Sequence, residues 1–233
     1  MVAEIFRMEN ICKEYAGREE ALHNACISIK CGEIHALMGK NGSGKTTLMK
    51  MIAGLVKPTS GELLFEGAPV GVASKAHVAY MPTEGYFFNY MTCRDVGRYY
   101  ADFFRDFDQN AFEAMLNRLQ LPMDHKASKL SSGMLAKLKL AATLCRDSRL
   151  LMLDEPLNGI DIIARDWTVE SIRAAMSPSR AIVLSSHLVD ELEKIIDQAI
   201  FMKNGQVVLA GEAQVLREEH HRSIVDLYKE IYA

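Results

Sequence analysis

The residues with the most specific chemistry form one glycine-rich segment, Gly39-Lys40-Asn41-Gly42-Ser43-Gly44-Lys45-Thr46. It matches the pattern G-x-x-x-x-G-K-[ST] at every fixed position, between an apolar run and a helical pattern. Glycines let the main chain approach a ligand, and free N–H groups at the start of a helix attract phosphate. Lys45 is expected to reach the β- and γ-phosphates of a nucleoside triphosphate, and Thr46 to ligate Mg²⁺. The predicted nucleotide-binding residues here are Gly39, Asn41, Gly42, Ser43, Gly44, Lys45, Thr46 and Thr47.

Two neighbouring carboxylates follow a second apolar run, at 150–153. An acid at the carboxyl end of a parallel strand lies where ligands bind in such sheets, beside the glycine-rich turn. Asp154 is therefore expected to hold Mg²⁺ through its water shell, and Glu155 to act as general base toward the attacking water. Two acids after a strand usually belong to a solvated loop. The intact glycine-rich segment is what favours the catalytic interpretation.

For the glycine-rich segment and the two acids to act together, the ends of the strands that precede them must lie at one edge of a sheet. Apolar runs predict strands at 5–8, 25–29, 34–38, 61–65, 78–81, 150–153 and 181–184 and near Ile200 and Val207. Helical periodicity predicts helices at 45–53, 110–119, 132–144, 162–176, 188–196, 213–219 and 223–232. Strand–helix alternation predicts an α/β fold with a parallel sheet and crossover helices. The middle of the chain, with nine aromatic residues in 86–107, is expected to be a helical insertion.

With these motifs in place, the chain resembles the ATP-binding cassette (ABC) family from residue 10 to about residue 212. The segment Leu130-Ser131-Ser132-Gly133-Met134 is similar to the family signature Leu-Ser-Gly-Gly-Gln and precedes a helix, as in the family. The resemblance implies a single ABC ATPase domain, 1–233, with a P-loop NTPase (RecA-like) α/β core. That core, with an antiparallel β subdomain, would comprise 1–85 and 150–212. The inserted α-helical signature subdomain would span 86–149 and C-terminal helices 213–233.

The resemblance also implies roles for single residues, with ATP and Mg²⁺ as cofactors. Tyr15 lies where the family has an aromatic ring that stacks on adenine. Ser131 and Gly133 of the signature would contact nucleotide, as would Asp161 of the D-loop-like segment Asn158-Gly159-Ile160-Asp161. His187 resembles the switch histidine at the γ-phosphate. The catalytic residues implied are Glu155, His187 and Lys45.

The chain departs from the family pattern at three places. One is Lys40 of the glycine-rich segment, which stands where proline is common and adds positive charge near the phosphates. The segment Tyr80-Met81-Pro82-Thr83-Glu84 aligns with the Q-loop of the family, and Thr83 stands where that loop usually carries glutamine. Thr83 is a metal-site candidate although its side chain is shorter. Ser132 and Met134 replace a glycine and the glutamine of the signature. The Ser131 hydroxyl and the Gly133 backbone are retained, so function is expected to survive.

The family resemblance implies two kinds of protein partner. Two ATPase subunits, as a homo- or heterodimer, would pair head-to-tail with each ATP between Lys45 of one and Ser131 of the other. A separate membrane-spanning transporter subunit would dock near the aromatic segment. Most of its rings are expected to form the core of the helical subdomain, and the four expected to be exposed are Tyr86, Phe87, Phe88 and Tyr90. The signature and the short segment after Gly211 resemble exporter-like ATPases of antibiotic or peptide efflux.

Composition excludes several other classes of protein. A formal charge of −3 gives no basic footprint for nucleic acid, so no nucleic-acid partner is expected. The five cysteines are scattered and lack a C-x-x-C pair, which indicates reduced thiols rather than disulfides or a zinc site. The apolar runs are too short to cross a bilayer, and no signal peptide is apparent. A cytoplasmic location, peripheral on the inner face of the cell membrane, is expected.

Two other functions fit the same motifs. One is an ABC ATPase of translation or DNA repair, which copurification with ribosomes rather than membranes would favour. The other is an ATP-sensing module without hydrolysis, against which Glu155 and His187 argue, although Thr83 leaves room for it. A phosphate-release assay would separate the sensor from the enzyme. The sequence determines neither the transported substrate nor the direction of transport.

Overall fold

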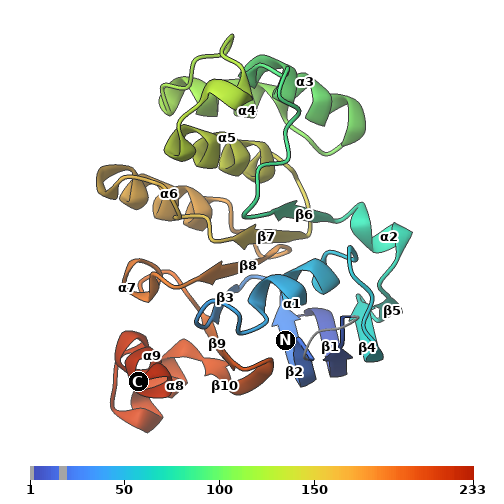
Figure 1. Cartoon of the computed structure of the whole chain (residues 1–233), viewed down its shortest axis with the longest axis vertical. Coiled ribbons are helices and arrows are strands. Elements are labelled where there is room, and N and C mark those ends of the chain that lie inside the picture. The colour runs from blue at the N-terminus through green and yellow to red at the C-terminus, as the bar shows by residue number, and fades with distance from the viewer. Residues whose placement is uncertain (1–2, 16–19) are drawn as a thin grey trace.

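The computed structural model describes residues 3–15 and 20–233, which form two sheets with helices packed around them (Figure 1). The larger sheet has six strands in the order β10-β9-β3-β8-β7-β6. Its members are β3 (Ile34–Met38), β6 (Val78–Met81), β7 (Leu150–Asp154), β8 (Ala181–Ser186), β9 (Gln198–Lys203) and β10 (Gln206–Glu212). All neighbours run parallel except β10, which is antiparallel to β9. The predicted parallel α/β sheet is confirmed.

The three central strands β3, β7 and β8 are buried along their whole length. Both faces of a parallel sheet are covered by helices, which is why these strands read as continuous apolar runs. In the register, Met38 lies opposite Ser186, and Asp154 lies opposite Ser185. The carboxyl ends of β3 and β7 therefore flank that of β8. This arrangement brings the segment after Met38 and the acids at 154 and 155 to one edge of the sheet.

The smaller sheet is antiparallel, with the order β2-β1-β4-β5. Its strands are β1 (Glu4–Lys13), β2 (Leu22–Lys30), β4 (Ser60–Phe65) and β5 (Ala68–Pro69). Helix α1 (Lys45–Ile52) shares one apolar cluster with this sheet and one face of the larger sheet, through Leu48, Met49 and Ile52. The helix that follows the glycine-rich segment is thereby held between two sheets.

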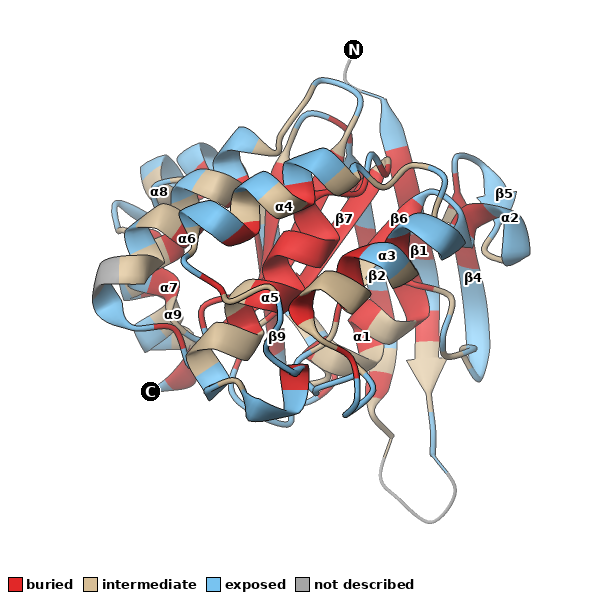
Figure 2. Cartoon of the chain, turned by 90° about the horizontal axis from the view of Figure 1, so that it is seen from above, coloured by how far each residue is buried: buried red, intermediate tan, exposed pale blue. Residues whose placement is uncertain are grey.

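The opposite face of the larger sheet is covered by helices from the second half of the chain. They are α6 (Ile162–Ala174), α7 (Val189–Leu192), α8 (Ala213–His220) and α9 (Ile224–Tyr232). Ile172, Leu192, Leu216 and Leu227 bury their side chains against this face. Figure 2 shows the result, a buried centre of strands with helices that expose their outer faces.

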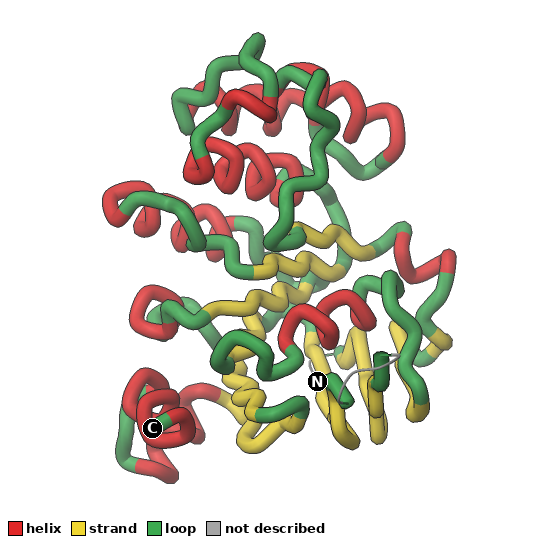
Figure 3. Tube along the Cα trace, in the orientation of Figure 1, coloured by secondary structure: helices red, strands yellow, loops and turns green. Residues whose placement is uncertain are grey.

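A helical layer lies beyond the β6 edge of the larger sheet (Figure 3). It contains α3 (Cys93–Phe103), α4 (Gln109–Arg118), the 3₁₀ turn η1 (Ala127–Lys129) and α5 (Ser132–Leu144), with its own apolar cluster around Phe112 and Leu138. Helix α3 was not predicted, although its buried residues Cys93, Val96, Gly97 and Tyr100 recur at helical spacing. The sequence does carry a start signal, since Thr92 and Asp95 form a capping box. The four-residue α2 (Val72–Lys75) was also missed.

The aromatic segment divides much as expected between core and surface. Tyr100 is buried, while Phe88 is 52% and Tyr90 is 67% exposed. The prediction is wrong for Phe87, which is half-buried because its ring packs against the Tyr100 ring, and it overlooked Phe103, which is 67% exposed.

The helix predicted at 188–196 is too long. α7 ends at Leu192, and a tighter turn follows in which Ile195 donates its N–H to the Leu192 carbonyl. Within the described residues no helix is long and apolar enough to cross a membrane. All five cysteines are free thiols.

Candidate functional site

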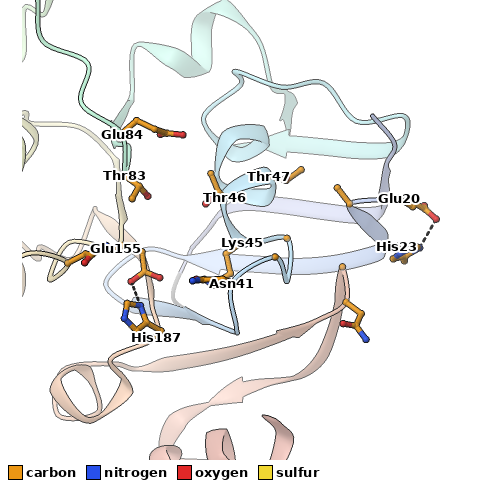
Figure 4. Close-up of a pocket in the computed structure, with 16 residues that line it drawn as sticks. Glu20, His23, Asn41, Lys45, Thr46, Thr47, Thr83, Glu84, Glu155 and His187 are labelled. Carbon is orange, nitrogen blue, oxygen red and sulfur yellow. Dashed lines mark hydrogen bonds and ion pairs between the residues drawn. The ribbon is translucent and has the colours of Figure 1, made fainter. Parts of the chain in front are cut away.

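A cavity of about 920 Å³ opens at the sheet edge where the glycine-rich segment and the two acids meet. Figure 4 shows Glu155 and His187 at one end, Lys45 in the middle, and Glu20 with His23 at the other end. The cavity is lined by Glu20, Ala21, His23, Asn41, Gly42, Gly44, Lys45, Thr46, Thr47, Thr83, Glu84, Glu155, Asn158, His187, Asn204 and Gly205.

The glycine-rich segment joins β3 to α1 and depends on the absence of two side chains. A Cβ on Gly39 would lie 2.4 Å from Ser43 Oγ and 2.6 Å from the Met202 carbonyl oxygen. Gly44, the N-cap of α1, has a φ of 102°, and a Cβ there would lie 2.8 Å from the Ala21 carbonyl oxygen. Both positions therefore require glycine.

The first turn of α1 presents free hydrogen-bond donors. Within the part of the chain that the structure describes, the N–H groups of Gly44, Lys45, Thr46 and Thr47 donate to no protein atom. Unpaired donors at a helix start, combined with the helix dipole, form an anion site. The segment therefore fits a chain of phosphates.

Lys45 places a buried ammonium beside these donors. Its Nζ donates to the carbonyl oxygens of Gly39 at 2.7 Å and Lys40 at 3.2 Å. Burial lowers the pKa of Lys45 from its ordinary value, while the nearby Glu155 and Asp154 carboxylates oppose that shift. The ammonium is thus held within the turn, ready to exchange a carbonyl for a phosphate oxygen.

Asp154 is buried and surrounded by hydroxyl groups from three elements. Thr46 Oγ1 donates to its Oδ2 at 3.1 Å, Tyr80 Oη to the same oxygen at 3.3 Å, and Ser185 Oγ to Oδ1 at 2.5 Å. Burial and the Asp154 charge raise the pKa of Tyr80 well above its ordinary value, so its hydroxyl stays a donor. The Thr46–Asp154 contact joins the two halves of the site.

Glu155 takes an uncommon backbone conformation at the end of β7. Its φ is +52°, in the left-handed region that residues other than glycine rarely adopt. The Glu155 N–H donates to Ser185 Oγ at 2.9 Å, and Oε2 lies 2.8 Å from His187 Nδ1. These contacts direct the carboxylate into the cavity beside the histidine (Figure 4).

The residues present fit a magnesium ion whose coordination is completed by phosphate. Mg²⁺ keeps several waters and takes only one or two protein carboxylates in such sites. The described residues contain no group of three or more His, Cys, Asp or Glu side chains able to hold a metal by themselves. Thr46 and Asp154 are in contact, and Thr83 lines the same cavity.

Seven predicted site residues are not among those that line this cavity. Gly39 and Ser43 belong to the glycine-rich segment and Asp154 contacts Thr46, while Tyr15, Ser131, Gly133 and Asp161 lie elsewhere. The Lys13 ammonium lies 4.9 Å above the centre of the Tyr15 ring. Tyr15 directly precedes residues 16–19, which are outside the described part of the chain. Ser131 and Asp161 are N-caps of α5 and α6, where they accept from Met134 and Ala164. Gly133 lies against the backbone of Gly159, so that a Cβ added at Gly133 would be 2.8 Å from the Gly159 carbonyl oxygen.

The end of the cavity opposite Glu155 was missed by sequence reasoning. His23 Nδ1 lies 2.5 Å from Glu20 Oε2, and the His23 N–H donates to the Gly205 carbonyl at 2.9 Å. A Cβ on Gly205 would lie 2.8 Å from the His23 ring. No local motif marks these residues, because Glu20 precedes β2, His23 belongs to β2 and Gly205 lies in the β9–β10 turn.

Comparison with known proteins agrees with this geometry. The model of the family described as ABC transporter matches residues 22–158, more than half of the chain. A lantibiotic transport ATP-binding protein of Streptococcus pyogenes is 30% identical over 89% of this chain and 91% of its own length. An uncharacterized ABC transporter ATP-binding protein of Bacillus subtilis is 29% identical over 94% of this chain and 75% of its own.

Solved structures share the fold. The structure of an ATP-binding subunit of an ABC transporter superposes with a TM-score of 0.86 at 23% identity, over 98% of this chain and all of that one. A dimeric ATP-binding cassette in a post-hydrolysis state bound to ADP and Pi gives 0.79 at 20% identity, over 89% of this chain and 98% of its own. The chain therefore belongs to the ABC transporter family, as an ATP-binding subunit that hydrolyses ATP to power transport.

Proposed function

We propose that the 920 Å³ cavity binds ATP with Mg²⁺, its phosphates on the glycine-rich segment and its terminal phosphate near Glu155. The observation that carries this proposal is the Thr46–Asp154 hydrogen bond, which joins the two halves of the site directly. The N–H groups of Gly44 to Thr47 are the donors, and Lys45 provides the positive charge for the β- and γ-phosphates.

Mg²⁺ would be held by Thr46 and, through water, by Asp154, with Thr83 as a further oxygen at the same cavity. When bound, the ion neutralises charge that develops on the phosphates. The role of the hydroxyls around Asp154 is to keep its carboxylate in place. Tyr80 and Ser185 do this from neighbouring strands, at 3.3 and 2.5 Å.

Glu155 is proposed as the general base and His187 as its orienting neighbour at the terminal phosphate. The carboxylate lines the cavity, and its Oε2 is 2.8 Å from the His187 ring, close enough for the two side chains to fix one another. A water between Glu155 and the terminal phosphate would lose its proton to the carboxylate as its oxygen bonds to the terminal phosphorus. The bond from that phosphorus to the bridging oxygen would break, and ADP would leave with that oxygen.

The signature residues are proposed to serve a second copy of an ABC ATPase. Ser131, Gly133 and Asp161 lie outside the cavity of their own chain, which supports a head-to-tail pair with Ser131 opposite the partner's Lys45. Tyr15 remains the proposed adenine contact. Family structures include dimeric cassettes, which agrees with such a pair.

The membrane-spanning partner is proposed to dock on the exposed aromatic residues of the helical layer. Phe88 and Tyr90 stack with ring centres 5.5 Å apart and are both largely exposed. Tyr86 is less available, since its hydroxyl is bonded to that of Tyr100 at 2.8 Å. Docking there would place the chain on the inner face of the cell membrane.

Export of a peptide or antibiotic is the proposed direction of transport. It is supported by the names of two relatives, one of lantibiotic transport and one of Nod factor export.

The decisive experiment is the substitution Glu155→Gln. The variant should bind ATP with unchanged affinity, hydrolyse it about 10²–10⁴-fold more slowly, and accumulate as a dimer when Mg²⁺ and ATP are present. Binding is measured by equilibrium titration, turnover by phosphate release, and dimer formation by light scattering. Glu170→Gln, on the exposed face of α6, is the matched control. Normal turnover in E155Q would remove Glu155 from the role of base.

A further inference from the structure

Lys139 is a buried lysine in α5 that the proposed function leaves without a role. Its side chain is only 6% exposed, and its ammonium donates to the carbonyl oxygens of Pro82 at 2.8 Å and Thr83 at 2.7 Å. The Glu84 carbonyl oxygen lies at 3.5 Å. A buried ammonium is costly unless its hydrogen bonds are made. Here three consecutive carbonyls of one loop surround it.

The loop at 82–84 has few other restraints. β6 ends at Met81, and no backbone–backbone hydrogen bond within the described residues involves 82–84. Glu84 forms an ion pair with Lys50 of α1 at 3.3 Å, but both side chains are substantially exposed, at 64% and 32%. Exposed ion pairs contribute little. The Lys139 ammonium is therefore the main polar restraint on this loop.

The same loop forms part of the nucleotide cavity. Thr83 and Glu84 both line it. Thr83 and Lys139 also line an adjoining cavity of about 210 Å³, together with Glu155 and Ser132. Ser132 begins α5, whose N-cap Ser131 belongs to the signature segment. Lys139 thus stands between the nucleotide cavity and the helix that carries the signature.

We propose that Lys139 is a positioning residue that fixes the loop 82–84 to α5, so that Thr83 and Glu84 move at the cavity only when α5 moves. A rigid helix holding consecutive carbonyls through one buried cation transmits a displacement better than an exposed ion pair does. The proposal depends on the proposed function only for the identity of the ligand in the cavity. The link between loop and helix exists without nucleotide and is measured without it.

The first test is the mobility of the loop in nucleotide-free protein. In Lys139→Met, the backbone order parameters of residues 83–85, from NMR relaxation, should fall from about 0.85 to below about 0.6. K139R, which keeps a charged donor, should retain the higher values. The control is Arg146→Met. Arg146 is also buried, two residues after α5, and bonds to Asp106 and to the Ala76 carbonyl rather than to the loop.

In R146M the order parameters of 83–85 should stay as in the wild type, whatever the variant loses in stability. Unchanged values in K139M, or an equal fall in R146M, would overturn the link between Lys139 and the loop. If K139M does not fold, K139Q, which removes the charge and keeps a polar side chain, serves for the same measurement.

The second test asks whether the link matters at the nucleotide cavity. In K139M, kcat/KM for MgATP should fall about tenfold, as expected when groups at a reacting site are misplaced, and K139R should recover most of it. In R146M, kcat/KM should remain within about twofold of the wild type. A mobile loop with unchanged kcat/KM would overturn the positioning role. An inactive wild-type protein would instead contradict the proposed function and leave the relaxation result valid.

Discussion

The hydroxyl of Ser185 links the two acids of the site, and its removal is the sharpest test of their arrangement. Ser185 lies on β8, fully buried, between Asp154 and Glu155. Its Oγ donates to Asp154 Oδ1 at 2.5 Å and accepts the Glu155 N–H at 2.9 Å. Its neighbour Ser186 is as buried, but among the described residues its Oγ accepts from the Leu188 N–H alone, at 2.9 Å. Ser185→Ala and Ser186→Ala are thus a matched pair.

The magnitudes of the two substitutions differ because of charge. A hydrogen bond to a charged group contributes about 1.5–3 kcal/mol to stability, and a neutral one about 1 kcal/mol. The Glu155 N–H keeps a partner in S185A, since it also lies 3.2 Å from the Ser185 carbonyl oxygen. S185A should therefore lose about 2 kcal/mol, or roughly 4–8 °C in melting temperature, and S186A about half as much.

Loss of the serine hydroxyl should slow ATP hydrolysis in S185A but not in S186A. An Asp154 carboxylate freed on one side no longer holds one orientation toward Thr46. If about 2 kcal/mol of positioning is lost in the transition state, kcat falls about 30-fold, while S186A stays within about twofold of the wild type. Melting is followed without nucleotide, and kcat by phosphate release. Equal kcat values in S185A and S186A would refute the reasoning.

Two further predictions concern stability in acid and the docking surface. His35 is buried on β3, where its Nε2 accepts the Lys30 N–H at 3.1 Å. Burial lowers the pKa of His35 from 6.5 to about 4, and the Glu33 carboxylate, 3.6 Å away, does not offset that shift. The unfolded chain therefore takes up the proton first, so up to about 3 kcal/mol of stability is lost as the pH falls from about 6.5 to about 4. Urea unfolding of His35→Gln should show a flatter dependence over this range, and an unchanged slope would contradict the assignment. The double variant Phe88→Asp/Tyr90→Asp should no longer copurify with the membrane partner, while its ATPase activity stays unchanged. The control Val72→Asp, at a side chain that is 89% exposed, should still copurify. If the double variant also copurifies, this surface is not the docking site.

The elements that position the glycine-rich segment could be predicted because their signals are local. Strands 34–38 and 78–81 and the helix 132–144 were predicted with the bounds that the structure shows. Continuous apolar runs mark strands covered on both faces, and a helical period marks one apolar face. α3 was missed although its buried positions recur at helical spacing, from Cys93 to Tyr100. Its capping box was the better signal.

The sequence by itself determined the family, and it predicted the proposed phosphate-binding segment and the two acids, since each depends on residue types at fixed short spacings. Only the tertiary structure decided which hydroxyls hold Asp154, which side chains close the His23 end of the cavity, and that Lys139 binds the Thr83 loop. Tyr80, Ser185 and Lys139 are each tens of residues from their partners. Their contacts arise from strand order and helix packing, so no short stretch of sequence contains them.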